Sequence, residues 1–71
     1  MKEDRLIQFG QKVRQLRKDR LLSQEAFADL AGVDRSYMGH IERGEKNITL
    51  TKIYQISDAL NLSPSVFFEE S

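Results

Sequence analysis

The stretch SQEAFADLAGVDRSYMGHIERG, residues 23–44, decides the fold because it carries two short helical segments on either side of a glycine. Ser23 and Asp34 are residue types that cap the free N–H groups at a helix start, and Gly32 and Gly44 are types that follow a helix end. The two expected helices are therefore joined by about three residues. That arrangement is a helix-turn-helix, whose second helix enters the major groove of DNA.

The same helix-start signal recurs four times along the chain. An apolar residue precedes a Ser, Thr or Asp, and a second apolar residue follows four positions later, so that the two can close as a hydrophobic staple. Pro64, directly after Ser63, suits the first helical position, where its missing N–H has no partner to lose. The four apolar pairs are Leu22 with Phe27, Val33 with Met38, Ile48 with Ile53, and Leu62 with Phe67.

A longer helix precedes these four, since Leu6, Phe9, Val13 and Leu16 recur at steps of three and four residues. No segment shows the sustained alternation of a half-buried strand. The sequence therefore predicts one all-α domain over residues 1–71, a compact bundle of helices that includes the helix-turn-helix. Its five expected helices span about 4–20, 24–31, 35–43, 50–60 and 64–69.

Composition narrows the chemistry that the chain can perform. Its 71 residues include no cysteine and one histidine, so it offers neither a disulfide nor a zinc site. A chain this small, without a cluster of catalytic residues, is not expected to be an enzyme, and we expect no cofactor and no small-molecule ligand. No apolar run approaches the roughly 20 residues of a membrane span, and no signal peptide is evident, so we expect a cytoplasmic protein.

The net charge is zero, but the charges are unevenly distributed. Residues 1–22 carry seven basic and three acidic groups, whereas residues 23–34 carry three acidic groups and no Lys or Arg. Residues 35–54 are net basic and residues 55–71 are net acidic. A neutral chain can thus present a basic face to a polyanion, although ordinary solvated charge explains the distribution about as well.

Residues 23–44 also resemble the XRE-type, or Cro/lambda-repressor-like, family, in which S-Q-E is followed by Ala, A-G-V, an apolar residue and I-E-x-G. The likeness covers roughly residues 8–62. VDRSYMGHIERGEKNITL and SPSVFFEE are similar, more narrowly, to the controller proteins of restriction–modification systems. The resemblance implies a stand-alone homodimer that binds a (pseudo)palindromic operator in double-stranded DNA, regulates transcription and controls its own operon.

The second helix of the motif keeps two apolar anchors, Met38 and Ile41, and leaves its polar residues for DNA. Arg35 lies at the end of the helix where such helices reach base edges, and its guanidinium can donate two bonds to guanine O6 and N7. A pair with Asp34 or plain exposure to solvent is the alternative. The predicted base-reading residues are Arg35, Ser36, Tyr37, Gly39 and His40.

Each of the other four positions has a structural alternative. Ser36 can contact a base, a phosphate or nothing, and Tyr37 can pack into the core or, as the controller resemblance implies, lie at the DNA surface. Gly39 lowers helix stability by about 1 kcal/mol relative to alanine. Close approach to DNA or to another helix would offset that loss, and random drift is the alternative. His40 can donate to DNA or be an ordinary surface residue.

Phosphate contacts, which position a protein without reading sequence, are predicted at a helix start and in the loop after the second helix. The resemblance assigns Gln24 to phosphate and to bracing the second helix. It also pairs Arg17 with Glu42 as a structural ion pair, with two exposed charges as the alternative. Lys12 and Arg14 are expected to add only long-range attraction. The predicted phosphate-contacting residues are Gln24, Arg43, Lys46, Asn47 and Thr49.

The C-terminal stretch LNLSPSVFFEES, residues 60–71, is more apolar than one short helix needs for its own docking. We predict a two-fold homodimer through about residues 55–71, which would set two recognition helices about 34 Å apart. The alternative buries both adjacent phenylalanines in the monomer. RNA polymerase is a further candidate partner. The predicted interface residues are Leu60, Leu62, Val66, Phe67 and Phe68.

Two other functions fit parts of the sequence. An antitoxin, or another solitary repressor of the XRE type, would share the DNA-binding fold, but an antitoxin usually carries a toxin-binding extension and none is evident. A protein-interaction adaptor without DNA binding would not explain the cluster of polar side chains at Arg35, Ser36, Arg43, Lys46 and Asn47.

Overall fold

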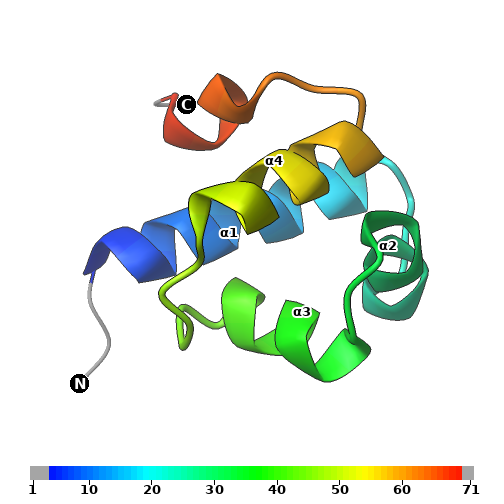
Figure 1. Ribbon diagram of the computed structural model, residues 1–71, viewed down its shortest axis with the longest axis horizontal. Helices are drawn as coiled ribbons and strands as arrows, with labels where there is room; N and C mark the ends of the chain where they lie inside the picture. Colours follow the sequence, from blue (N-terminus) through cyan, green and yellow to red (C-terminus); the bar gives the residue numbers. More distant parts are fainter. Residues whose placement is uncertain (1–3, 70–71) are drawn as a thin grey trace.

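The computed structural model describes residues 4–69, which contain only helices and connecting turns (Figure 1). The central pair of helices forms the expected helix-turn-helix. The elements in chain order are α1 (Asp4–Asp19), α2 (Gln24–Ala31), α3 (Arg35–Glu42), α4 (Leu50–Ala59) and the 3₁₀ helix η1 (Pro64–Phe68).

The prediction of a fifth α-helix is wrong, because the C-terminal segment winds more tightly as η1. The amide of Val66 donates to the carbonyl of Ser63 at 3.1 Å, three residues back rather than four. A five-residue segment beginning at Pro64 is too short for a ladder of four-residue hydrogen bonds, and 3₁₀ turns are usual at this length. The four α-helices match their predicted bounds to within one residue at each end.

The core lies between the five elements, and the residues of the predicted staples fill part of it and pack around it. Phe27, Met38 and Phe67, the second members of three staples, are buried. The first members of all four pack half-buried against the same cluster. The buried apolar residues are Phe9, Val13, Phe27, Ala28, Ala31, Met38, Ile41, Ile56, Leu60 and Phe67.

Two of the four expected capping bonds form. The side chains of Ser23 and Thr49 each accept a hydrogen bond from the amide three residues ahead, at 3.0 and 3.2 Å. Asp34 and Ser63 have the extended backbone of a cap residue, but their side chains make no capping bond. The sequence pattern therefore places all four helix starts, while the capping bond itself is wrong at two of them.

The four α-helices end in the same way, each with one residue in the left-handed conformation. These residues are Leu21, Gly32, Gly44 and Asn61, with φ between 56° and 74°. The amide of the following residue then donates to the carbonyl five residues earlier, as Val33 does to Ala28 at 2.9 Å. This is the Schellman motif, which satisfies carbonyl groups that a helix end would otherwise leave unpaired.

In three of these four turns, the residue after the left-handed one is also the first member of the next staple. Leu22, Val33 and Leu62 therefore close one helix and open the next. Each connection is a left-handed residue, an apolar residue and a cap residue. We call these the three-residue junctions, and they span residues 21–23, 32–34 and 61–63.

α3 is fixed to α1 by a close crossing and a buried ion pair. Gly10 is buried where the helices cross, and a β-carbon there would lie 2.6 Å from the carbonyl oxygen of Glu42, which is closer than real contacts allow. Two turns along α1, the guanidinium of Arg17 donates to the Glu42 carboxylate from Nε at 2.8 Å and from Nη2 at 3.0 Å. Both residues are buried, so each supplies the solvation that the other has lost.

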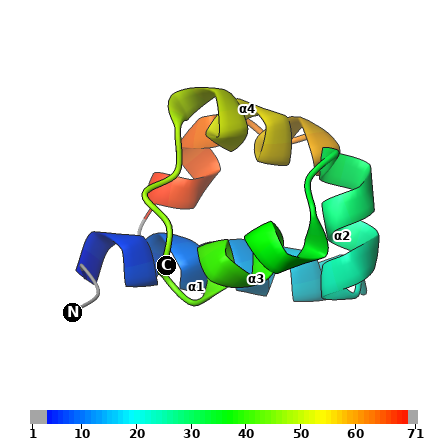
Figure 2. The ribbon, with the colours of Figure 1, turned by 60° about the horizontal axis from the view of Figure 1, so that its bottom comes forward.

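The helices separate two faces of the molecule. In Figure 1, α3 and η1 lie on opposite sides, with α1 and α4 between them. Figure 2 shows α3 running beside α1, with α2 closing the end of the bundle. Within residues 4–69, none of the helices combines the length and apolar content needed to cross a bilayer.

The buried ion pair gives a first prediction. Glu42→Ala leaves the Arg17 guanidinium buried without its partner, so we expect the free energy of unfolding to fall by about 3–5 kcal/mol. That loss is as large as the roughly 3–5 kcal/mol that a domain of this size usually has, so urea denaturation followed by circular dichroism should find the variant largely unfolded. The double variant Arg17→Met, Glu42→Met removes both charges and should recover most of the loss. A double variant no more stable than Glu42→Ala would contradict this reading.

The left-handed backbone gives a second prediction. Leu21 is 94% exposed and has φ 57°, a conformation that costs a residue with a β-carbon roughly 1–2 kcal/mol. Leu21→Gly removes that strain, but glycine loses more backbone entropy on folding, which lowers the stability by about 0.5–1 kcal/mol. We expect a net rise of up to about 1 kcal/mol in the free energy of unfolding, measured by chemical denaturation. Leu30→Gly, at an exposed position inside α2, should instead lower it.

Candidate nucleic-acid interface

The outward side of α3 carries polar residues because its apolar residues face the core. Met38 and Ile41 are buried, whereas Arg35 and Ser36 are exposed. Within the part of the chain that the structure describes, neither exposed side chain has a hydrogen bond or an ion pair, and Arg35 is not tied to Asp34. The guanidinium at the start of α3 is therefore available to a ligand.

Tyr37 is half-buried and lies between the two predicted alternatives. Its ring packs against the core, and the ammonium of Lys52 lies 6.0 Å from the ring centroid. Lys52 Nζ also donates to Gln55 Oε1 at 3.2 Å, and Gln55 Nε2 donates to the carbonyl of Ala31 at 2.6 Å. The two α4 side chains thus connect Tyr37 to the end of α2. Sequence reasoning missed both, because a bond between helices leaves no periodic signal.

Gly39, which the sequence predicts to read a base, is buried beneath neighbouring side chains and is not exposed on the outward side of α3. A β-carbon at this position would lie 3.1 Å from Arg43 Nη1 and 3.4 Å from Gln24 Oε1. The side chains of Arg43 and Gln24 therefore cover the glycine. Its role in the structure is to make room for these two polar side chains, which then form the surface themselves.

Gln24 joins the start of α2 to the ion pair beneath it. Its Nε2 donates to Glu42 Oε1 at 3.2 Å, the same oxygen that accepts from Arg17 Nη2. Arg17 Nη1 in turn donates to the carbonyl of Leu22 at 2.9 Å. The Glu42 carboxylate is thus the point at which α1, the start of α2 and α3 are held together.

His40 and Arg43 share a carboxylate that the predicted site did not include. Glu45 Oε1 lies 2.8 Å from His40 Nδ1 and 3.1 Å from Arg43 Nε, and Arg43 Nη2 lies 3.3 Å from His40 Nδ1. A neutral imidazole can donate from Nδ1 to Glu45 or accept there from Arg43, but not both. The turn at Gly44 brings Glu45 back over α3, since its amide donates to the carbonyl of His40 at 2.9 Å. In the sequence, the signal for this contact is that Glu45 follows His40 by five residues, across the turn at Gly44.

The remaining predicted phosphate-contacting residues lie in the loop between α3 and α4. Lys46, Asn47 and Thr49 are exposed there, in the loop that follows α3. The hydroxyl oxygen of Thr49 accepts from the Lys52 amide, which leaves its O–H free to donate. Among the described residues, no group of three or more His, Cys, Asp and Glu side chains could hold a metal ion.

The predicted dimer surface is divided between the core and the exterior. Leu60 and Phe67 are 1% and 4% exposed, which corrects their assignment because they fill the core of their own chain. The Phe67 ring packs 5.2 Å from that of Phe9. Phe68 is 64% exposed, so the two adjacent phenylalanines do face different ways. Residues 70 and 71, which the prediction also assigned to dimerisation, lie outside the described residues.

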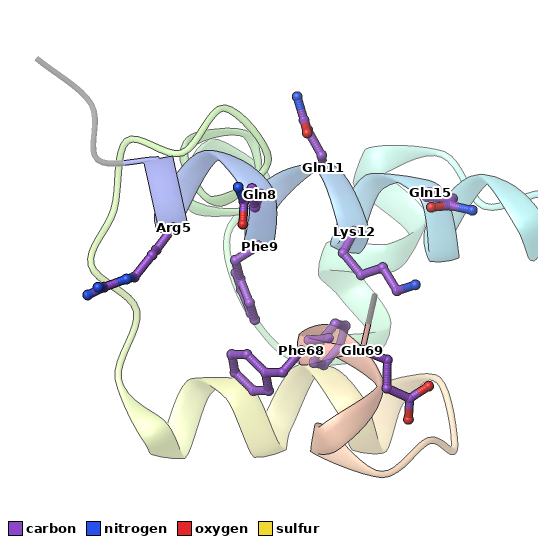
Figure 3. Close-up of a pocket in the computed structure, with 9 residues that line it drawn as sticks. Arg5, Gln8, Phe9, Gln11, Lys12, Gln15, Phe68 and Glu69 are labelled. Carbon is purple, nitrogen blue, oxygen red and sulfur yellow. The ribbon is translucent and has the colours of Figure 1, made fainter. Parts of the chain in front are cut away.

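Phe68 packs against Phe9 of α1, and two further apolar side chains are exposed on α4, the helix that packs against η1. The centroid of the Phe68 ring lies 5.7 Å from that of Phe9, and both side chains line a cleft of about 640 Å³ between α1 and η1 (Figure 3). Leu50 and Tyr54, one turn apart on α4, are exposed as well, and α4 packs against η1. These two were absent from the predicted set, because a helix with apolar residues on two sides does not reveal by periodicity which side is inward.

Comparison with known proteins agrees with this geometry. The helix-turn-helix family HTH_3 matches residues 13–67. Control protein C.MunI of a Mycoplasma species is 40% identical over 65 residues, covering 90% of this chain and 88% of that protein. Control protein C.BamHI of Bacillus amyloliquefaciens is 46% identical over 57 residues, covering 79% of this chain and 70% of that protein.

Solved structures give the same result. The restriction-modification controller protein C.AhdI from Aeromonas hydrophila matches with a TM-score of 0.87 at 46% identity, covering 89% of this chain and 96% of that one. The biofilm regulator SinR, in complex with DNA, matches with a TM-score of 0.80 at 31% identity, covering 86% and 98%. By name these relatives are control proteins and regulators, not enzymes. This chain therefore belongs to the XRE-type helix-turn-helix family.

Proposed function

We propose that this chain is a sequence-specific DNA-binding regulator of transcription that serves a restriction–modification system and controls its own operon. The observation that carries the proposal is the outward side of α3, where Arg35 and Ser36 are exposed. The inward side of the same helix is fixed to α1 by the Arg17–Glu42 ion pair. The similarity to control proteins supports the restriction–modification assignment. Methyltransferase and endonuclease genes beside its own would add to that support, whereas a neighbouring toxin gene would favour an antitoxin.

In this proposal the residues around α3 divide into two roles. Arg35 reads a guanine from the major groove, with Ser36, Tyr37 and His40 beside it along the helix. Gly39 contributes indirectly, by allowing Arg43 and Gln24 to close over it. The phosphate contacts come from Gln24, Arg43, Lys46, Asn47 and Thr49, which surround the end of α3.

The size of the chain argues for a dimer. Its backbone extends 29 Å along the longest axis and presents one helix-turn-helix within residues 4–69, whereas successive major grooves on one side of a duplex lie about 34 Å apart. Two half-sites therefore require two copies. We place the contact on Phe68, Tyr54 and Leu50 with Leu62 and Val66, because this surface is apolar and η1 lies away from α3. Dimerisation would make the response steep in protein concentration, and RNA polymerase is the candidate partner for activation.

Base reading by Arg35 is tested by selecting bound sites from random duplex DNA. We expect Arg35→Ala to lower operator affinity by about 1–3 kcal/mol and to relax the preference at one base position in each half-site. Arg14→Ala, which removes the same charge from the exposed side of α1, should weaken binding slightly and equally for all sequences. An unchanged site preference in Arg35→Ala would remove this residue from the base-reading set.

The dimer surface is tested by analytical ultracentrifugation. Phe68→Glu places a charge in the proposed contact and removes apolar burial worth about 1.5–3 kcal/mol, so we expect the dimer dissociation constant to rise at least about tenfold. Leu30→Glu, an equally exposed apolar position on α2, serves as the control and should leave it unchanged. Dissociation by the Leu30 variant alone would place the contact elsewhere.

A further inference from the structure

Glu45 is an acidic residue placed among side chains that the proposed function directs at DNA phosphate. Its Oε1 accepts from Arg43 Nε at 3.1 Å and lies 2.8 Å from His40 Nδ1. The three side chains are all partly exposed, so they lie at the surface of the interface and not beneath it. Neither the predicted site nor the proposed roles include this carboxylate.

The chemistry of these donors makes the arrangement a competition. A carboxylate and a phosphate are both anions that accept from guanidinium and imidazole N–H groups. Arg43 Nε has one hydrogen, so while it donates to Glu45 it cannot also donate to a phosphate oxygen. The backbone turn at Gly44 holds Glu45 within reach of both donors, since the Glu45 amide is bonded to the carbonyl of His40.

Resting on the proposed function, we infer that Glu45 is a built-in competitor for DNA phosphate. In the free protein its Oε1 accepts from Arg43 Nε and lies within hydrogen-bond distance of His40 Nδ1, and duplex DNA gains these two contacts only by displacing it. Since binding to random sequence depends almost entirely on phosphate contacts, Glu45 lowers the affinity for non-operator DNA. It is a positioning residue that sets how strongly the chain is retained on DNA without reading any base.

The test compares the affinity of full-length variants for a random-sequence duplex over a range of salt concentrations. Glu45→Gln keeps the size of the side chain and removes its charge. We expect about two- to fivefold tighter binding, the range that exposed ion pairs contribute. One additional phosphate contact should also steepen the dependence of log K on log salt by up to about 0.9. Glu25→Gln, an exposed carboxylate in the first turn of α2, is the matched control and should change both quantities less.

A second background separates displacement from a general effect of charge. In a chain that already carries Arg43→Gln and His40→Ala, Glu45→Gln should give no larger gain than Glu25→Gln. An equal gain from both glutamates in the unaltered background, or a Glu45→Gln gain that persists without Arg43 and His40, would overturn the inference. If the unaltered chain shows no salt-dependent binding to duplex DNA, the proposed function itself fails. Normal binding that Glu45→Gln leaves unchanged overturns only the role of Glu45.

Discussion

The Arg17–Glu42 ion pair determines which side of α3 faces outward. α3 has eight residues and two fully buried apolar side chains, so hydrophobic burial alone would leave its rotation about its own axis poorly defined. The bidentate contact is directional, and the additional bonds to Gln24 and to the Leu22 carbonyl fix both partners. Replacing such a pair with apolar residues often leaves stability unchanged, so what it contributes here is a defined orientation.

Two glycines allow this arrangement by leaving space on opposite sides of α3. At Gly10 the absent β-carbon lets α1 approach the carbonyl groups at the end of α3. At Gly39 the absent β-carbon lets Arg43 and Gln24 lie across the outer side. The first glycine brings Arg17 within reach of Glu42, and the second allows polar side chains to cover the helix. Both positions are unfavourable for an isolated helix, and tertiary contacts explain both.

Sequence predicted the helices well because their signals are local. A cap residue and a staple lie within one turn of chain, so the starts of α2, α3, α4 and η1 could be placed without knowing the fold. Other features depend on elements that meet only after folding. These are the burial of Leu60 and Phe67, the hydrogen bond from Gln55 to α2 and the hydrogen bond from Arg43 to Glu45. Polar residues of α3 could be nominated for DNA contact, but their partners within the protein could not.

The three-residue junctions have a consequence for how the chain can change in length. Because one apolar residue closes a helix and opens the next, an insertion at any of these junctions would separate the two roles and break one or both contacts. The connection from α3 to α4, by contrast, has four residues between Gly44 and Thr49. Homologues should therefore gain or lose residues there, where Lys46 and Asn47 lie, so that the phosphate contacts proposed for this loop can change while the bundle stays intact.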